Sequence, residues 1–160
     1  MKKLHSTIFL LLAAAVLSLA TGCTHNCGDI GDLFGYWRLN SMTADGTPVE
    51  LYPETAEDGR PVRLYTWAFQ SQIVMIHTFY DHEDSSQATG TWQRTDRTLM
   101  LDFDHRDDGG TEFYTPPAAL KLVEGGVTPL EIILMNPNEM KLSYTADDGV
   151  TYEYRLGKLI

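Results

Sequence analysis

Short runs rich in β-branched and aromatic residues, each ended by a turn signal, occupy most of the chain from residue 62 onward. The runs 62–69 and 72–79 are separated only by Gln70 and Ser71, which leaves room for a tight hairpin and nothing longer. Further runs follow at hairpin spacing, at 89–94, 99–103, 130–135, 140–144 and 150–156. Apart from one helical turn expected at 117–122, no stretch shows a convincing helical period. The pattern predicts an all-β fold of eight or nine short antiparallel strands, arranged as an up-and-down barrel or a sandwich.

The first of the expected strands is Phe34–Met42, in which side-chain character alternates with period two. Alternation places Gly35 and Trp37 on one face of this strand and Tyr36 on the other. The segment 47–61 holds three prolines and four acidic residues. It therefore predicts a long loop between the first strand and the next.

The N-terminus has the features of a targeting segment. Two lysines precede an apolar run at 8–17, and the segment ends at Gly22 and Cys23. The apolar run is too short for a comfortable transmembrane helix. A small residue before a cysteine resembles a bacterial lipobox, in which cleavage after Gly22 is followed by acylation of Cys23 with chains such as palmitate. The alternative is an ordinary secretory signal that is cleaved near Ala20.

The lipobox interpretation divides the chain into a signal peptide at 1–22, a tether at 23–33 and a single domain at 34–160. Two or three acyl chains on Cys23 would hold the protein stably to a membrane. We therefore expect a lipid-anchored protein of the cell envelope, in the outer membrane. Cys27 would then have no intramolecular partner, so the sequence predicts no disulfide framework.

Acidic residues outnumber basic ones in this chain, with 22 Asp and Glu against 12 Lys and Arg and a formal net charge of −10. Removing residues 1–22 takes away two lysines and no acid, which changes the formal net charge from −10 to −12. Such a charge argues against a nucleic-acid partner and against a polybasic membrane-surface helix.

A Gly-x-Trp motif on the first strand of a secreted all-β chain resembles the lipocalin superfamily. The motif is Gly35-Tyr36-Trp37, with Asp45-Gly46 soon after it and a final hairpin at 140–156. This combination is similar to the lipocalin-like lipoprotein domains of Bacteroidota. The resemblance implies an antiparallel up-and-down β-barrel of about eight strands.

The resemblance also implies structural roles for three residues. Trp37 would close the floor of the barrel, and Arg155 from the last strand would pack over it through a cation–π contact. Gly35 would let the chain turn into the barrel without a side chain to clash.

For function, the resemblance implies an internal cavity that takes up a small apolar or amphipathic molecule. The side chains expected to line it are aromatic, aliphatic or sulfur-bearing, as in many ligand pockets, with His77 as either a polar anchor or a satisfied barrel histidine. The ligand-binding candidates are Leu64, Met75, His77, Phe79, Leu101, Phe103, Tyr152 and Tyr154. The alternative is that these side chains fill the barrel as plain core, since an eight-stranded barrel can be just wide enough for side chains alone.

Two acidic loops that contain a histidine, 81–84 and 102–108, are the clusters in which reactive or metal-binding chemistry could be sought. Neither has the spacing of a known metal motif, so solvated turns are the simpler interpretation and no metal or other cofactor is predicted. The sequence has no nucleophile elbow, phosphate-binding loop or dinucleotide-binding glycine motif. It therefore predicts a protein that is not an enzyme.

Two functions follow as expectations. In the first, the chain is a membrane-anchored lipocalin-like binding protein with a small apolar or amphipathic ligand in its barrel. In the second, it is a structural or interaction module of the cell envelope with a filled barrel, whose loops or outward aromatics such as Tyr36 and Tyr65 contact a protein or a glycan.

Overall fold

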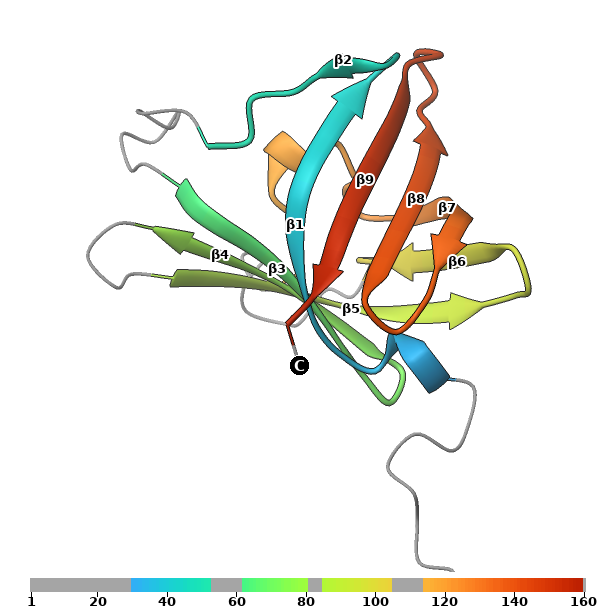
Figure 1. Ribbon diagram of the computed structural model, residues 1–160. Helices are drawn as coiled ribbons and strands as arrows, with labels where there is room; N and C mark the ends of the chain where they lie inside the picture. Colours follow the sequence, from blue (N-terminus) through green and yellow to red (C-terminus); the bar gives the residue numbers. More distant parts are fainter. Residues whose placement is uncertain (1–29, 53–61, 81–84, 105–113, 160) are drawn as a thin grey trace, which may run out of the picture.

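The computed structural model describes residues 30–52, 62–80, 85–104 and 114–159, in which β-strands are the dominant secondary structure (Figure 1). Two short 3₁₀ helices lie within these described segments: η1 (Gly31–Leu33) precedes the strands, and η3 (Ala118–Leu120) lies between β6 and β7. The strands are β1 (Gly35–Ala44), β2 (Thr47–Pro48), β3 (Val62–Gln70), β4 (Ile73–Tyr80), β5 (Ser85–Arg94), β6 (Thr98–Asp102), β7 (Val127–Met135), β8 (Glu139–Thr145) and β9 (Thr151–Lys158). No helix within the described segments is long and apolar enough to span a membrane.

The strands form one closed antiparallel barrel. Neighbours pair in the order β1, β3, β4, β5, β6, β7, β8 and β9, and a further pairing of β9 with β1 closes the ring. The two-residue β2 is an addition to the ring that pairs with the end of β1. Closure leaves the eight barrel strands without a free edge. The prediction of an all-β, antiparallel up-and-down barrel of about eight strands is confirmed.

The strands lie where the sequence pattern places them, with changes mainly at their ends. β5 begins at Ser85 and β7 at Val127, a few residues before the expected starts, because both strands open with residues that do not alternate in hydrophobicity. The helical turn expected at 117–122 is η3. Within the loop expected at 47–61, the described part contains β2, while residues 53–61 lie outside the described segments.

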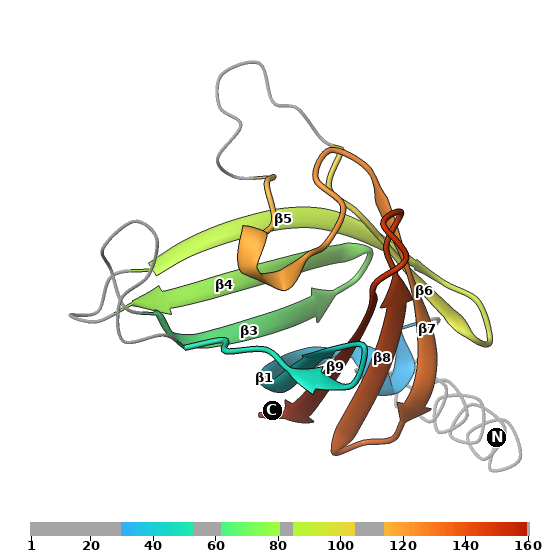
Figure 2. The ribbon, with the colours of Figure 1, turned by 90° about the horizontal axis from the view of Figure 1, so that it is seen from above.

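The two ends of the barrel differ in their connections. One end, which we call the turn end, carries the tight turns at 71–72, 95–97 and 136–138, together with η1 and the end of β9 (Figure 1). The other, which we call the loop end, carries the long connections 49–61 and 103–126. Viewed from above, η3 lies between the wall formed by β4 and β5 and the wall formed by β8 and β9 (Figure 2).

Side chains alternate between the barrel interior and the outer surface along each strand. In β8, for example, Met140, Leu142 and Tyr144 are buried, while the residues between them are partly exposed. A β-bulge between Leu39 and Ser41 changes the phase of β1, so that Leu39 and Met42 both face the interior.

The strand alternation at Gly90 brings a glycine to the interior face of β5. A Cβ at this position would lie 2.4 Å from the carbonyl oxygen of Asp102 and 2.8 Å from Cδ1 of Phe103. Glycine therefore makes the room that the Phe103 ring occupies in the core.

Candidate functional site

The barrel interior is lined mainly by large aromatic and aliphatic side chains. Trp37, Trp67, Phe69 and Tyr154 are all fully buried there. The rings of Trp67 and Tyr154, from opposite sides of β1, lie 5.6 Å apart, and the rings of Phe69 and Trp92 meet edge to face at 6.3 Å.

Four of the eight ligand-binding candidates face this interior. Leu101, Phe103, Tyr152 and Tyr154 are all buried members of the core. Leu99, Met140 and Leu142, three further apolar side chains of β6 and β8, are also buried.

The other four candidates, Leu64, Met75, His77 and Phe79, lie on the outer face of the barrel, so their expected inward orientation is wrong. In β4 the buried residues are Val74, Ile76 and Thr78, and the three candidates alternate with them. Both faces of β4 are apolar, which is why period two alone could not choose between them. In β3 a bulge between Val62 and Leu64 shifts the alternation of side chains. Tyr65, which is 3% exposed, therefore faces the interior, and its neighbour Leu64 faces outward.

The outward residues form an aromatic row across β1 and β4. His77 lies 6.3 Å from Tyr36 and stacks on Phe79 at 6.0 Å between ring centroids. Partial burial lowers the pKa of His77, and its Nε2 atom is buried without a hydrogen-bond partner. The position of Tyr36 in this row confirms it as an outward aromatic. Tyr65, also expected to point outward, instead faces the interior and stacks on Tyr52, with 5.9 Å between the ring centroids.

Two indole groups inside the barrel were not predicted as site residues. Trp67 and Trp92 are 0% and 5% exposed, and the Nε1 atom of each is buried without a hydrogen-bond partner. Pairing the first two long strands in register would have identified Trp67 as an interior residue, because it lies directly across from Trp37 in the β1–β3 pair. Both tryptophans lie near the turn-end termini of their strands, so their N–H donors are in the half of the barrel nearer the turn end.

The loop end of the barrel is partly covered by two contacts. The Tyr154 hydroxyl donates to the carbonyl oxygen of Leu120 in η3 at 2.8 Å, and Leu120 is fully buried. Burial raises the pKa of Tyr154 far above its ordinary value. The second is the Tyr52 hydroxyl, which donates to the carbonyl oxygen of Leu39 in β1 at 2.7 Å, and burial raises the pKa of Tyr52.

The turn end is closed around Trp37. Its indole Nε1 donates to the carbonyl oxygen of Leu33 in η1 at 2.8 Å. The basic group over its ring is Lys158, with Nζ 4.5 Å from the ring centroid. Gly35, two residues earlier, has φ of 114°, a conformation that residues with a side chain rarely adopt.

The expected contact of Arg155 with Trp37 is wrong. Arg155 is exposed on the outer face, across from Ser41 in β1 and Lys141 in β8. Tyr154 and Leu156 on either side of it point inward, so alternation directs Arg155 away from the Trp37 ring.

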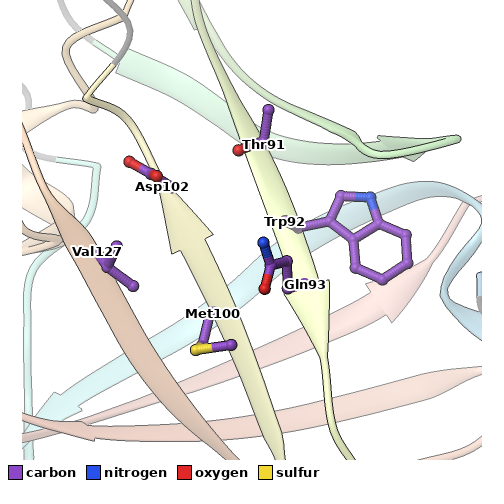
Figure 3. A pocket seen from close by; sticks show the side chains of 6 residues that line it. All are labelled: Thr91, Trp92, Gln93, Met100, Asp102 and Val127. Atoms are coloured by element: carbon purple, nitrogen blue, oxygen red, sulfur yellow. The ribbon is translucent and has the colours of Figure 1, made fainter.

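A shallow groove of about 70 Å³ lies on the outer surface over β5 and β6. The residues around it are Thr91, Trp92, Gln93, Met100, Asp102 and Val127. Figure 3 shows the Trp92 ring directed away from Met100 and Val127, toward the other side of β5. The groove is thus separated from the interior by the sheet.

Within the described segments, no group of three or more histidine, cysteine or acidic residues could hold a metal ion. The loop 81–84 and the greater part of 102–108, where such chemistry was considered, lie outside these segments. Cys23 and Cys27 also lie outside them.

No family model matches this chain, and no curated protein matches it. Solved structures with a similar fold include a lipocalin-like protein from Bacteroides uniformis, with 13% identity and a TM-score of 0.49 over 81% of this chain and 100% of that chain. An uncharacterized protein from Bacteroides eggerthii has the same identity and TM-score over 79% of this chain and 98% of its own. A complex of bovine odorant-binding protein with a selenium-containing odorant has 14% identity and a TM-score of 0.39, over 83% and 74% of the two chains.

The strand pairings establish the architecture independently of these similarities. Eight antiparallel strands joined in sequence and closed by the pairing of β1 with β9 form the up-and-down barrel that lipocalins have. In its fold, this chain is a closed, eight-stranded, antiparallel up-and-down barrel.

Proposed function

We propose that this protein is a lipocalin-like binding protein that holds a small amphipathic ligand, largely apolar with one hydrogen-bond acceptor, inside its barrel. The observation that carries the proposal is the pair of buried indole donors in Trp67 and Trp92, each without a partner. A buried donor left unpaired costs about 1–3 kcal/mol. A ligand oxygen that accepts from one of these N–H groups would remove that cost.

The chemistry of the surroundings agrees with such a ligand. The interior side chains near Trp92 include Phe69, which meets its ring edge to face, and Leu101, which lies across from it in β6, and both are fully buried. Ligand pockets typically combine such a lining with a few fixed polar groups that orient the ligand. The hydroxyl of Tyr154 is already engaged by Leu120, whereas the indole N–H groups of Trp67 and Trp92 have no partner.

The second part of the proposal concerns the location of the protein. Cys23 follows an apolar targeting segment and a small residue, which supports acylation at this cysteine and attachment to the outer membrane. The protein would then present its barrel in the cell envelope, a short tether away from the bilayer. The described residues begin at residue 30, within the expected tether, and β1 begins at Gly35, directly after it.

The test is a titration of the folded, unacylated Cys23→Ala protein with 1-anilinonaphthalene-8-sulfonate, an amphipathic dye whose sulfonate accepts hydrogen bonds. We expect saturable 1:1 binding with increased dye fluorescence. Trp92→Phe should weaken binding about tenfold, the equivalent of one hydrogen bond of about 1.4 kcal/mol. Tyr36→Phe, which removes a hydroxyl from the outer face, is the control and should leave the affinity unchanged. A folded protein that excludes the dye would contradict the proposal.

A second candidate function is favoured by the outer aromatic row of Tyr36, His77 and Phe79. Phe79 is 38% exposed, and the three rings contact one another on the outer face of the barrel. In this case the barrel would be a filled scaffold whose outer face contacts a protein or a glycan of the envelope. The dye titration separates the two functions, because a filled barrel has no saturable interior site.

A further inference from the structure

The exposed apolar side chains of the described residues are concentrated at the turn end of the barrel. Seven large hydrophobic residues are clearly exposed, and five of them belong to this end. We call these five the turn-end apolar group: Phe34, Ile73, Ile133, Leu134 and Leu159. The remaining two, Phe79 and Val127, lie toward the loop end.

The positions of these residues follow from the strand ends. Phe34 directly precedes β1, and Ile73 is the first residue of β4. Leu159 follows β9 and its N–H donates to the carbonyl oxygen of Tyr36 at 2.8 Å, which fixes it beside the start of β1. Ile133 and Leu134 lie at the bulge near the end of β7. All five therefore surround the same end of the barrel as η1.

Charge is distributed in the opposite way. The described loop-end connections and the strand termini beside them carry seven carboxylates against two cations: Asp45, Glu50, Asp102, Asp104, Glu124, Asp147 and Asp148 against Arg63 and Lys121. At the turn end the charges are nearly balanced: Asp32, Asp96, Glu131 and Glu139 against Arg94, Arg97 and Lys158. A surface of anionic lipids would repel the loop end and tolerate the turn end.

The tether brings the same end toward the membrane. Ile30, the first described residue, is seven positions after Cys23, and even a fully extended chain of that length spans only about 25 Å. Because η1 lies at the turn end, an acyl group on Cys23 would hold this end, and not the loop end, close to the bilayer.

We propose that the turn end of the barrel rests on the bilayer, with the turn-end apolar group inserted among the lipid headgroups and the loop end directed into the aqueous phase. The inference rests on the proposed acylation of Cys23. Apolar side chains at an interface gain stability from partial burial in the headgroup region, and the lipid anchor supplies the rest of the attachment. The cover formed by η3 would then face water, where a ligand can reach it.

Site-directed spin labelling tests this orientation in the acylated full-length protein, reconstituted in vesicles of phosphatidylethanolamine and phosphatidylglycerol. A nitroxide is placed at Ile73→Cys or Phe34→Cys at the turn end, and at Val127→Cys or Phe79→Cys at the loop end, in a Cys27→Ser background. The pairs are matched in exposure, with Ile73 and Val127 at 45% and 46% and Phe34 and Phe79 both at 38%. Collisions with lipid-soluble oxygen and with an aqueous nickel chelate are measured for each label.

We expect the two turn-end labels to show several-fold lower nickel accessibility and higher oxygen accessibility than their loop-end matches. The difference should vanish for the same labels in the soluble Cys23→Ala protein. Equal nickel accessibility at both ends of the acylated protein would overturn the inference. If mass spectrometry finds Cys23 without lipid, the inference fails together with the anchor, whereas dye binding reports on the interior site separately.

Discussion

Lys158 lies directly across from Trp37 in the β1–β9 pair, with its Nζ atom 4.5 Å from the centroid of the indole ring. The same Nζ donates to the carbonyl oxygens of Asp32, at 2.7 Å, and Phe34. One ammonium group thus joins the last strand, the first strand and η1. This contact, together with the bond from Trp37 to Leu33, closes the barrel at the turn end.

Replacing Lys158 with methionine should destabilise the fold, since it removes the cation–π contact and two charge-assisted hydrogen bonds while keeping an apolar stem. We expect a loss of about 2 kcal/mol in the free energy of unfolding, measured by urea denaturation. Arg155→Met is the matched control, because Arg155 is exposed on the outer face, and it should change stability by less than about 0.5 kcal/mol. A larger loss in the control than in Lys158→Met would contradict this account of the turn end.

Gly90→Ala should disturb the packing of β5 against β6. The new Cβ would meet the Asp102 carbonyl oxygen at 2.4 Å and the Phe103 ring at 2.8 Å, and backbone cannot move away as a flexible side chain can. Overpacking of this kind costs about 2–3 kcal/mol. Gly126→Ala is the control, because its Cβ would meet only Cγ1 of Val123 at 3.1 Å, and its thermal midpoint should change much less. Equal midpoints for the two variants would show that the core accommodates a methyl group at residue 90.

Stability should fall with rising pH above about 10, because of Tyr154. Burial, with a smaller contribution from Tyr144 and Tyr152, raises the pKa of Tyr154 above the ordinary value of 10.0. Above pH 10 the unfolded chain therefore releases the phenolic proton while the folded protein keeps it, which favours unfolding by up to about 1.4 kcal/mol per pH unit.

Tyr154→Phe isolates this effect. At pH 8 we expect it to cost about 1 kcal/mol, from the lost hydrogen bond to Leu120. Between pH 10 and 11 its stability should decline less steeply than that of the parent protein. Urea denaturation at each pH measures both quantities, and parallel declines would refute the role given to Tyr154.

The existence and order of the strands could be predicted from the sequence, but the face that each side chain takes could not be predicted everywhere. In β8, polar and apolar residues alternate cleanly, and the interior face is unambiguous. In β4, Val74 and Ile76 compete with Met75 and Phe79, and only packing against β3 and β5 in the closed barrel decides which pair is buried. Bulges, which add one residue without a sequence signal of their own, shift the phase again in β1 and β7.

The error at Arg155 has a different cause. Tyr152, Tyr154 and Leu156 alternate along β9 and face the interior. The same alternation places Arg155 on the outer face and Lys158 on the interior face. The resemblance implies that a basic residue near the end of the last strand packs over Trp37. The alternation of side chains along this strand determines that the residue is Lys158 and not Arg155. The donors of Trp67 and Trp92 could not be predicted as unpaired, because that property depends on the packing of several strands.

The targeting prediction can be tested with the two cysteines. Cys23→Ala should abolish incorporation of labelled palmitate and release the protein from the membrane fraction, because the thiol that carries the lipid is removed. Cys27→Ala, four residues further along, is the matched control and should be labelled and retained as in the parent protein. Labelling that survives Cys23→Ala would refute the assignment.

The presence of a ligand inside the barrel is the central claim, and native mass spectrometry of the protein purified folded from its host tests it most directly. The account predicts one small molecule per chain, largely apolar and bearing a hydrogen-bond acceptor, that is released on unfolding and retained less well by Trp92→Phe. A folded barrel that carries no molecule beyond the covalent lipid on Cys23, and that also excludes the dye, would contradict the claim.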